Sequence, residues 1–345
     1  MGLTIMIKDG IDFHNVVEMT ETEKGWRMWR IPSGVAGRKD EGASETACRS
    51  TGVELRFKMK GDAVVIKLCV EENMQAQTAA VFYGAFQGGW RNSTRAIHTH
   101  ETAITIERPQ NLDFLLRITE ERGLGFNPEV VRILLPGGSC RYLGIEGEVE
   151  APGSEDYPEK TYLAYGSSIT HGSLGLSAAC TYPFQIAQQF GCDCINLGFP
   201  GNAHAEKPLA EYIAGRMDWD FASVEIGINM LSAFSEKDFE KRAREFLSVL
   251  KEDGRLVFVS NIFGYYREDR RKADKFREIV KACAEDGMIF TDGPELLDDP
   301  ALVSQDLAHP SMRGIYRIGE RWYEIMEKHM KNSLIASRKK EGGTK

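Results

Sequence analysis

Two different patterns of apolar residues divide the chain into two parts. Between about residues 50 and 150, apolar and polar residues alternate, as in Val53-Glu54-Leu55-Arg56-Phe57. A period of two is typical of a β-strand with one buried face. Further apolar runs, separated by turn residues, occupy positions 64–70, 78–86, 103–107, 112–118 and 130–135. Because we find no long helical pattern among them, residues 1–150 are predicted to form an antiparallel, jelly-roll-like β-sandwich.

The first 50 residues and the segment after residue 150 are less regular. We expect the N-terminal segment, before Gly52, to wrap around the edge of the sandwich. Residues 151–158 are polar and contain two prolines and a glycine, which predicts a domain boundary. The linker is short, so we expect the sandwich to pack against the following domain and to help shape the mouth of its site.

After this boundary, short apolar runs alternate with helical patterns. Strands are predicted at 161–165, 193–197, 221–226, 256–259 and 288–290, and helices at 182–190, 205–216, 239–250, 273–283 and 315–326. This alternation predicts an α/β domain over residues 151–335, with a parallel sheet covered by helices on both faces. Residues 336–345 are predicted to be a polar, frayed tail.

Composition narrows the function classes. The chain has 345 residues, which suits two domains, and a net charge of −8, which disfavours nucleic acid and anionic membranes as partners. We find neither a signal peptide nor an apolar run long enough to span a bilayer. The seven cysteines follow no disulfide or metal-binding spacing and are predicted to be reduced, mostly buried thiols of a cytoplasmic protein. The oligomeric state stays open, a homo-oligomer included.

Chemically useful residues follow the predicted strands, at the edge of a parallel sheet where functional loops gather. Each could be an ordinary turn or cap residue when considered alone. Together they supply a nucleophile, backbone and amide donors, a base and a group to orient that base, which are the parts of an acyl-transfer site. The five candidates are Ser168, Gly201, Asn229, Asp306 and His309.

These segments resemble the conserved blocks of the SGNH/GDSL hydrolases over about residues 158–330. Gly-Ser-Ser-Ile-Thr at 166–170 is similar to the first block and makes Ser168 the nucleophile. The resemblance implies that His309 is the base, that Asp306 orients it, and that the Ser168 and Gly201 N–H groups and the Asn229 amide form the oxyanion hole. It also implies a three-layer, flavodoxin-like fold. The predicted order, with a β-sandwich before this domain, resembles a subset of the SGNH/GDSL family that includes carbohydrate esterases and a polyketide-tailoring acyltransferase.

The sequence departs from the family pattern at two positions. Ser167 replaces an Asp that mainly shapes the nucleophile loop, so we expect activity to persist. Met230 replaces the Asp that often follows the third-block Asn, and we expect it to change the apolar lining near the site. The α/β-hydrolase fold shares the order Ser, Asp, His but fits less well, because its elbow requires Gly at position 170, which is Thr here.

The sequence therefore predicts a serine esterase that hydrolyses a small acyl ester, such as an O-acetyl group on a carbohydrate-like substrate, without cofactor or metal. Two alternatives stay open: an acyltransferase with the same triad, and an inactive carbohydrate-binding protein.

Several other residues have structural interpretations that compete with functional ones. His171 and His204 lie in loops near the site and could line the pocket or be solvated. His98 and His100 have metal-compatible spacing, but no carboxylate-rich stretch of sequence surrounds them. Trp26, Trp29 and Trp90 could stack on sugar, although such residues are more often core or interface anchors. The charged run at 267–275 predicts a solvated helix face.

Overall fold

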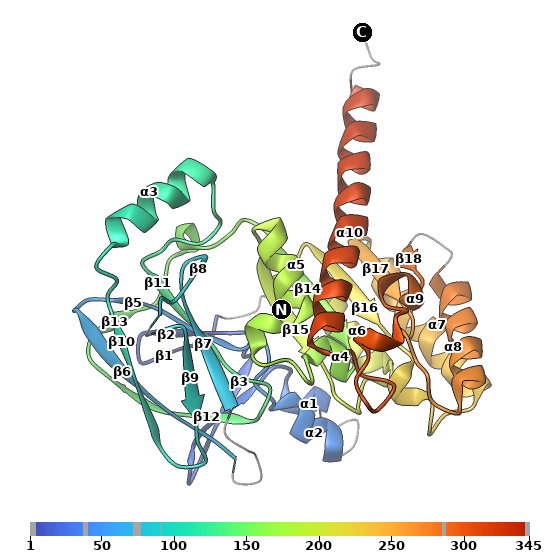
Figure 1. Ribbon diagram of the computed structural model, residues 1–345, viewed down its shortest axis with the longest axis horizontal. Coiled ribbons are helices and arrows are strands. Elements are labelled where there is room, and N and C mark those ends of the chain that lie inside the picture. Colours follow the sequence, from blue (N-terminus) through green and yellow to red (C-terminus); the bar gives the residue numbers. More distant parts are fainter. Residues whose placement is uncertain (1–4, 37–40, 72–76, 91, 285–287, 342–345) are drawn as a thin grey trace.

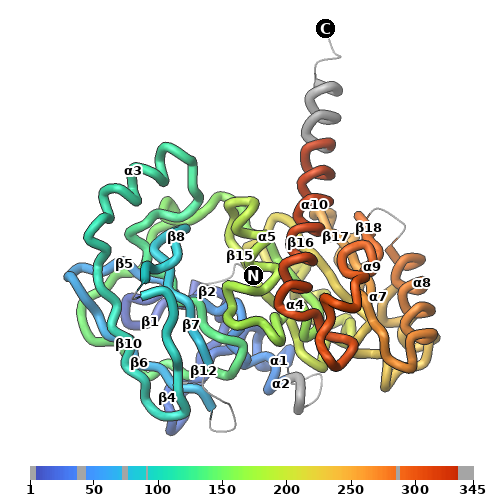
Figure 2. The backbone as a smooth tube through the Cα atoms, in the orientation of Figure 1, coloured from blue at the N-terminus to red at the C-terminus, as the bar shows by residue number. Residues whose placement is uncertain are grey.

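The computed structural model describes residues 5–36, 41–71, 77–90, 92–284 and 288–341. Figure 1 shows two antiparallel sheets on one side of the molecule and a parallel sheet surrounded by helices on the other. In the tube view, the N-terminal helices α1 and α2 lie beneath the junction of these two halves (Figure 2). The predicted combination of an antiparallel sandwich and a helix-covered parallel sheet is therefore confirmed.

The larger antiparallel sheet has eight strands in the order β1-β2-β5-β11-β7-β8, with β13 paired to β5 and β9 paired to β7. The smaller sheet has five strands in the order β10-β6-β12-β4-β3. Their bounds are β1 (Ile7–Lys8), β2 (Ile11–His14), β3 (Glu18–Thr22), β4 (Gly25–Trp29), β5 (Glu54–Met59), β6 (Ala63–Val70), β7 (Gln77–Tyr83), β8 (Phe86–Gln87), β9 (Thr94–Ile97), β10 (Thr102–Glu107), β11 (Val130–Leu134), β12 (Cys140–Glu146) and β13 (Val149–Glu150). Leu55 of one sheet and Ile66 of the other belong to one buried apolar cluster, so the sheets pack face to face.

The strand predicted at 112–118 is wrong, because this segment is helix α3 (Leu112–Arg122). Leu112, Leu115, Leu116 and Thr119 recur at the spacing of one helix face, which a short window does not distinguish from a strand. Gly123 ends the helix in the left-handed conformation, with φ of 61°, which is a common helix terminator.

The N-terminal segment lies at the sandwich edge, as predicted, but it is more regular than expected. Strands β1 and β2 extend the larger sheet at one edge, and β3 and β4 extend the smaller sheet. Helices α1 (Ser33–Ala36) and α2 (Glu41–Ala47) follow. Ile31, Ala36 and Ala47 are fully buried in the same apolar cluster as residues of the parallel sheet, so this segment also joins the second half.

The parallel sheet has five strands in the order β15-β14-β16-β17-β18, which is the order of flavodoxin-like folds. The strands are β14 (Thr161–Gly166), β15 (Asp193–Gly198), β16 (Phe221–Glu225), β17 (Leu256–Ser260) and β18 (Ile289–Thr291). The helices are α4 (Ser168–His171), α5 (Tyr182–Phe190), α6 (Lys207–Ala214), α7 (Glu236–Asp253), α8 (Arg270–Ala284), α9 (Gly293–Leu296) and α10 (Met312–Glu341). Helix α10 includes part of the predicted tail, whereas residues 342–345 lie outside the described residues.

Alternate residues of β14 explain why helices cover both faces of this sheet. Leu163 and Tyr165 point into a cluster with residues of α6, α7 and α8, whereas Tyr162 and Ala164 point into a cluster with residues of α5 and α10. The sheet is therefore the middle layer of three, as the alternation of strands and helices predicted.

Buried charges connect the two halves. The polar side of β5 carries Glu54 and Arg56, and Arg56 donates two hydrogen bonds of 2.6 and 2.7 Å to Asp193 at the start of β15. Arg132 of β11 donates two hydrogen bonds of 2.7 Å to Glu54. The four side chains are each less than 10% exposed. The halves thus pack directly on each other, while the division at residues 150 and 151 stays our prediction.

The tryptophans predicted as interface or sugar-stacking residues occupy three different environments. Trp29 packs against the apolar cluster of the parallel-sheet half, and Trp26 packs against the sandwich core. Trp90 is fully exposed, so it belongs to neither the core nor the interface. The three residues therefore do not act as a single interface anchor.

The cysteines match the prediction of free, mostly buried thiols: five are buried and two are half-buried. Among the described residues, no helix is long and apolar enough to cross a membrane.

Candidate active site

The nucleophile candidate lies in a sharp turn after β14. Ser167 caps helix α4 by accepting a 3.1 Å hydrogen bond from the Ile169 N–H, which agrees with the expectation that this residue shapes the loop. Ser168 is the first residue of this four-residue helix. A Cβ on Gly198, at the end of β15, would lie 2.2 Å from the main-chain nitrogen of His171 in α4. Only glycine at this position therefore lets α4 pack so closely against the end of β15.

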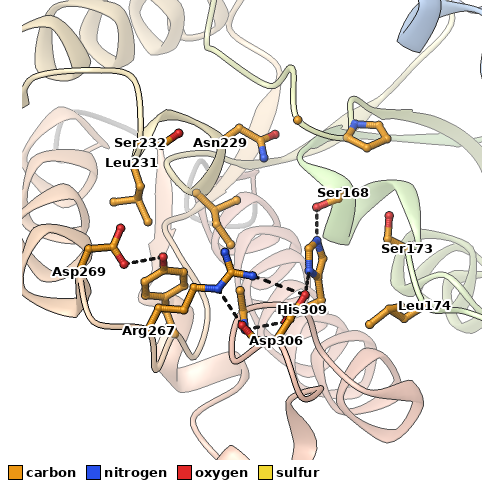
Figure 3. Close-up of a pocket in the computed structure, with 15 residues that line it drawn as sticks. Ser168, Ser173, Leu174, Asn229, Leu231, Ser232, Arg267, Asp269, Asp306 and His309 are labelled. Carbon is orange, nitrogen blue, oxygen red and sulfur yellow. Dashed lines mark hydrogen bonds and ion pairs between the residues drawn. The ribbon is translucent and has the colours of Figure 1, made fainter. Parts of the chain in front are cut away.

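The structure brings Ser168, His309 and Asp306 into one hydrogen-bonded row (Figure 3). The Ser168 Oγ lies 2.7 Å from the His309 Nε2, and the His309 Nδ1 lies 2.5 Å from the Asp306 Oδ2. An ionised carboxylate only accepts hydrogen bonds, so the imidazole proton belongs on Nδ1. Nε2 is then left with its lone pair directed at the Ser168 hydroxyl.

Asp306 is held as an anion by its own turn. Its Oδ1 accepts hydrogen bonds of 2.9 Å from the N–H groups of Ala308 and His309 and of 2.8 Å from the Ser304 hydroxyl. Partial burial opposes ionisation, but these donors and the His309 ring outweigh it and lower the pKa of Asp306 well below its usual value. Leu307, between Asp306 and Ala308, adopts a left-handed conformation with φ of 61°, which is uncommon for a residue other than glycine.

The oxyanion-hole candidates face the same cavity as the triad. Gly201 adopts a φ of 72°, a conformation that favours glycine, and the space around its Cα is open. The Asn229 Oδ1 accepts a 3.2 Å hydrogen bond from the Ala203 N–H, which orients the amide so that its Nδ2 is available to a ligand. In Figure 3, Asn229 and Ser168 face each other across the cavity. Its volume is about 600 Å³, and Ser168, Gly201, Asn229, Asp306 and His309 all line it.

Three other residues that the sequence placed near the site lie outside it. Met230 is fully buried in the core, so it does not change the lining, which comes instead from Ile228 and Leu231. His171 is buried beneath the nucleophile turn, and burial lowers its pKa well below the usual value. The His204 ring lies 5.3 Å from the Phe234 ring and is tilted from it by 52°. Neither histidine lines the cavity around Ser168.

Sequence reasoning missed three residues that line the cavity opposite Ser168. Arg267 donates a 2.7 Å hydrogen bond from Nε to the main-chain oxygen of Asp306, and its guanidinium lies 3.6 Å from Oδ2 of the same residue. Tyr265 donates a 2.7 Å hydrogen bond to Asp269. All three follow β17, so the strand-end argument applied to the fourth strand would have found them. Arg267 was instead assigned to a solvated helix face.

The paired histidines of the sandwich stack on each other. The rings of His98 and His100 lie 5.2 Å apart. Within the described ranges, no group of three or more His, Cys, Asp or Glu residues is arranged to hold a metal ion.

Residues 164–316 match the GDSL-like Lipase/Acylhydrolase family. Comparison with curated protein sequences finds no match.

Several solved structures share the fold over most of this chain. A salicylyl-acyltransferase from a tetracycline biosynthetic pathway is 16% identical, with a TM-score of 0.74, over 92% of this chain and 94% of its own. A family two carbohydrate esterase from Clostridium thermocellum, in complex with cellohexaose, is 13% identical, with a TM-score of 0.54, over 81% and 92%. An acetyl xylan esterase from the rumen bacterium Butyrivibrio proteoclasticus is 12% identical, with a TM-score of 0.54, over 96% and 98%.

Proposed function

We propose, on the premise that residues 164–316 form a GDSL-like lipase/acylhydrolase domain, that this protein is a serine esterase with Ser168 as its nucleophile. The observation that carries this proposal is the row from the Ser168 Oγ through the His309 ring to the Asp306 carboxylate, with distances of 2.7 and 2.5 Å. This is the arrangement of nucleophile, base and orienting acid that acyl transfer requires.

The reaction follows from the placement of the protons. His309 Nε2 takes the hydroxyl proton as the Ser168 Oγ attacks the ester carbonyl, and Asp306 stabilises the resulting imidazolium. The imidazolium then gives this proton to the leaving alcohol oxygen, so that an acyl-serine remains. Water, deprotonated by His309, attacks the acyl carbonyl, and release of the acid returns the proton to Ser168. These steps use only groups of the chain and water.

Three donors are proposed to stabilise the tetrahedral oxyanion: the N–H groups of Ser168 and Gly201 and the Asn229 Nδ2. They support the proposal because donors fixed before the reaction need little reorganisation as the negative charge develops. The Ala203 N–H holds the Asn229 oxygen, which leaves the amide nitrogen as the group directed toward the substrate.

For the substrate, we propose a small acyl ester, with an O-acetyl group on a carbohydrate as the first candidate. Support comes from the shared fold with a carbohydrate esterase and an acetyl xylan esterase, and from the polar wall that Tyr265, Arg267 and Asp269 add to the cavity. Acyl transfer to an alcohol acceptor is the second candidate. It is supported by the fold shared with the salicylyl-acyltransferase, whose TM-score of 0.74 is higher than the 0.54 of the two esterases.

A panel of p-nitrophenyl acyl esters and acetylated sugars, assayed with and without alcohol acceptors, tests these proposals. We expect acetate release by the wild type, no turnover above background by Ser168→Ala, and near-normal turnover by Ser232→Ala, a second serine of the cavity. A fluorophosphonate probe should label Ser168 in peptide mapping. Label on another serine would contradict the assignment, as would failure of the wild type to turn over any ester. An acyl product formed only with an acceptor would favour the transferase.

A further inference from the structure

A fully buried cation lies between the two halves of the molecule. Arg30, which follows β4 of the sandwich, is 0% exposed, and its guanidinium lies over the ring of Phe199 at 5.1 Å. Among the residues that the structure describes, no carboxylate forms an ion pair with it. Burial lowers the pKa of Arg30 to about 9, which keeps it charged at neutral pH. A buried charge without a counter-ion is costly, so its interactions need an explanation.

The partners of Arg30 are main-chain oxygens, and two of them belong to the end of β15. Its guanidinium donates hydrogen bonds of 2.9 Å to the oxygens of Asn196, Gly198 and Thr46. The Asn196 side chain in turn donates a 2.9 Å hydrogen bond to the Thr170 oxygen in α4. Arg30 therefore holds the strand end from which the Gly201 turn begins, and this strand end contacts the nucleophile helix.

The bond to Gly198 is the first of a continuous chain through two peptide groups. Gly198 and Phe199 share one peptide group. Its oxygen accepts the hydrogen bond from Arg30, and its N–H donates a 2.8 Å hydrogen bond to the Gly166 oxygen. The next peptide donates through the Ser167 N–H to the Glu225 Oε2, also at 2.8 Å. Glu225, at the end of β16, is 0% exposed. A cation thus lies at one end of the chain and a carboxyl group at the other.

We propose that Arg30 is a positioning residue for the oxyanion hole. Through this chain, Arg30 and Glu225 hold the turn before Ser168 and the turn before Gly201 at a fixed separation, and so hold the two backbone N–H donors in register. Hydrogen bonds in a continuous chain polarise and strengthen one another in a buried, low-dielectric site. This inference rests on the proposed esterase function and assigns a catalytic contribution to the N-terminal half.

A buried arginine at the other end of the same strand provides a matched control. Arg56 is 1% exposed and also crosses from the sandwich to β15, but it binds Asp193 at the amino end of that strand. It makes no hydrogen bond to either turn within the described parts of the chain. Arg30→Met and Arg56→Met should both lower the thermal stability, but only the first should disturb the oxyanion hole.

The experiment compares wild type, Arg30→Met, Arg30→Lys and Arg56→Met at a temperature where each is folded. For Arg30→Met, we expect kcat on an activated acetyl ester to fall roughly 10- to 100-fold with KM changed less than threefold, because small displacements of donors are costly in the transition state. The affinity for a trifluoromethyl ketone, which forms a tetrahedral anion, should fall in parallel. Arg30→Lys should fall between Arg30→Met and wild type, and Arg56→Met should keep kcat within about threefold.

Hydrogen–deuterium exchange gives a readout that does not depend on ester hydrolysis. Peptides covering 161–172 and 193–203 should exchange faster in the Arg30 variants than in Arg56→Met. If Arg30→Met does not fold, Arg30→Lys carries the test. Unchanged kcat and exchange in the Arg30 variants, or an equal loss of kcat in Arg56→Met, would overturn this inference while leaving the esterase proposal intact. A wild type that hydrolyses no ester would instead overturn the proposed function, and exchange would still decide whether Arg30 holds the two turns.

Discussion

The Thr51 hydroxyl, in the N-terminal half, donates a 2.7 Å hydrogen bond to the main-chain oxygen of His171, the last residue of the helix that begins with Ser168. The sandwich therefore contacts the nucleophile helix directly. Together with the hydrogen-bond chain that begins at Arg30, this contact indicates that the N-terminal half supports the site.

Expression of residues 155–345 alone tests this relationship. The fragment lacks Arg56, so Asp193 loses its partner, and it lacks the buried apolar side chains of Ile31, Ala36 and Ala47. We expect the fragment to aggregate, or to lose at least about tenfold in kcat/KM on a small acetyl ester, because apolar surface and a buried charge become exposed. Size-exclusion chromatography and the esterase assay measure both effects. A monodisperse fragment as active as the full chain would show that the sandwich is a passive appendage.

Asn229→Ala tests the proposed oxyanion hole. Removal of one preorganised donor should lower kcat by roughly 10²–10³ while KM changes little, since this donor acts mainly on the charge of the transition state. Steady-state kinetics on one activated ester provide the measurement. Met230→Leu is the matched control, because Met230 is the next residue but is buried in the core, and its volume-conserving replacement should leave kcat near normal. If kcat is unchanged in Asn229→Ala, Asn229 serves only to shape the turn.

Arg267 is expected to hold the Asp306 turn in place. Arg267→Met removes a charge-assisted hydrogen bond to the main chain of Asp306, so this loop should become more mobile and kcat should fall about tenfold. Arg267→Lys should restore part of the loss if the positive charge near Asp306 contributes. Arg271→Met, an exposed arginine of α8, controls for a general change of surface charge. Equal kcat values for wild type and Arg267→Met would show that Arg267 lines the cavity without holding the Asp306 turn in place.

The buried ion network predicts how stability depends on pH. Burial opposes ionisation of Glu54, but the guanidinium groups of Arg132 and Arg56 outweigh it and lower the pKa of Glu54 from 4.5 to about 2. Between these values the unfolded chain binds a proton that the folded protein does not. The free energy of unfolding should therefore fall as the pH is lowered through this window, by at most about 1.4 kcal/mol per pH unit from this residue.

Urea unfolding between pH 3 and pH 6 measures this effect. Glu54→Gln should be less stable at neutral pH, because Arg132 and Arg56 both lose the charge of a carboxylate that they bind, and its stability should change less steeply with pH. Glu268→Gln, which alters an exposed carboxyl group, should keep the wild-type slope. A Glu54→Gln protein with the same acid dependence as the wild type would contradict the predicted role of Glu54.

Local patterns were enough to predict most of the elements after residue 50 and to single out five residues that line one cavity, whose catalytic roles stay a prediction. Strand and helix periods depend on neighbours a few positions apart, and parallel strands bring their following loops to one edge of the sheet. Asp306 and His309 could be predicted as a pair because they are close in sequence and one short turn carries both side chains. One exception is α3, where a segment compatible with either period was assigned to a strand. Another is the N-terminal segment, whose strands β1 to β4 and helices α1 and α2 were not predicted.

Long-range contacts could be seen only in the tertiary structure. Arg30 and Gly198 are 168 positions apart, and nothing near Arg30 in sequence indicates which oxygens it binds. The alternation along β5 correctly placed Glu54 and Arg56 on the face opposite the sandwich core, which a period of two predicts to be solvated. Only the packing of the two halves shows that Asp193 and Arg132 cover this face. The periodicity of a strand determines which face each of its side chains points to. The partner that a side chain meets on that face depends on which distant segment packs there.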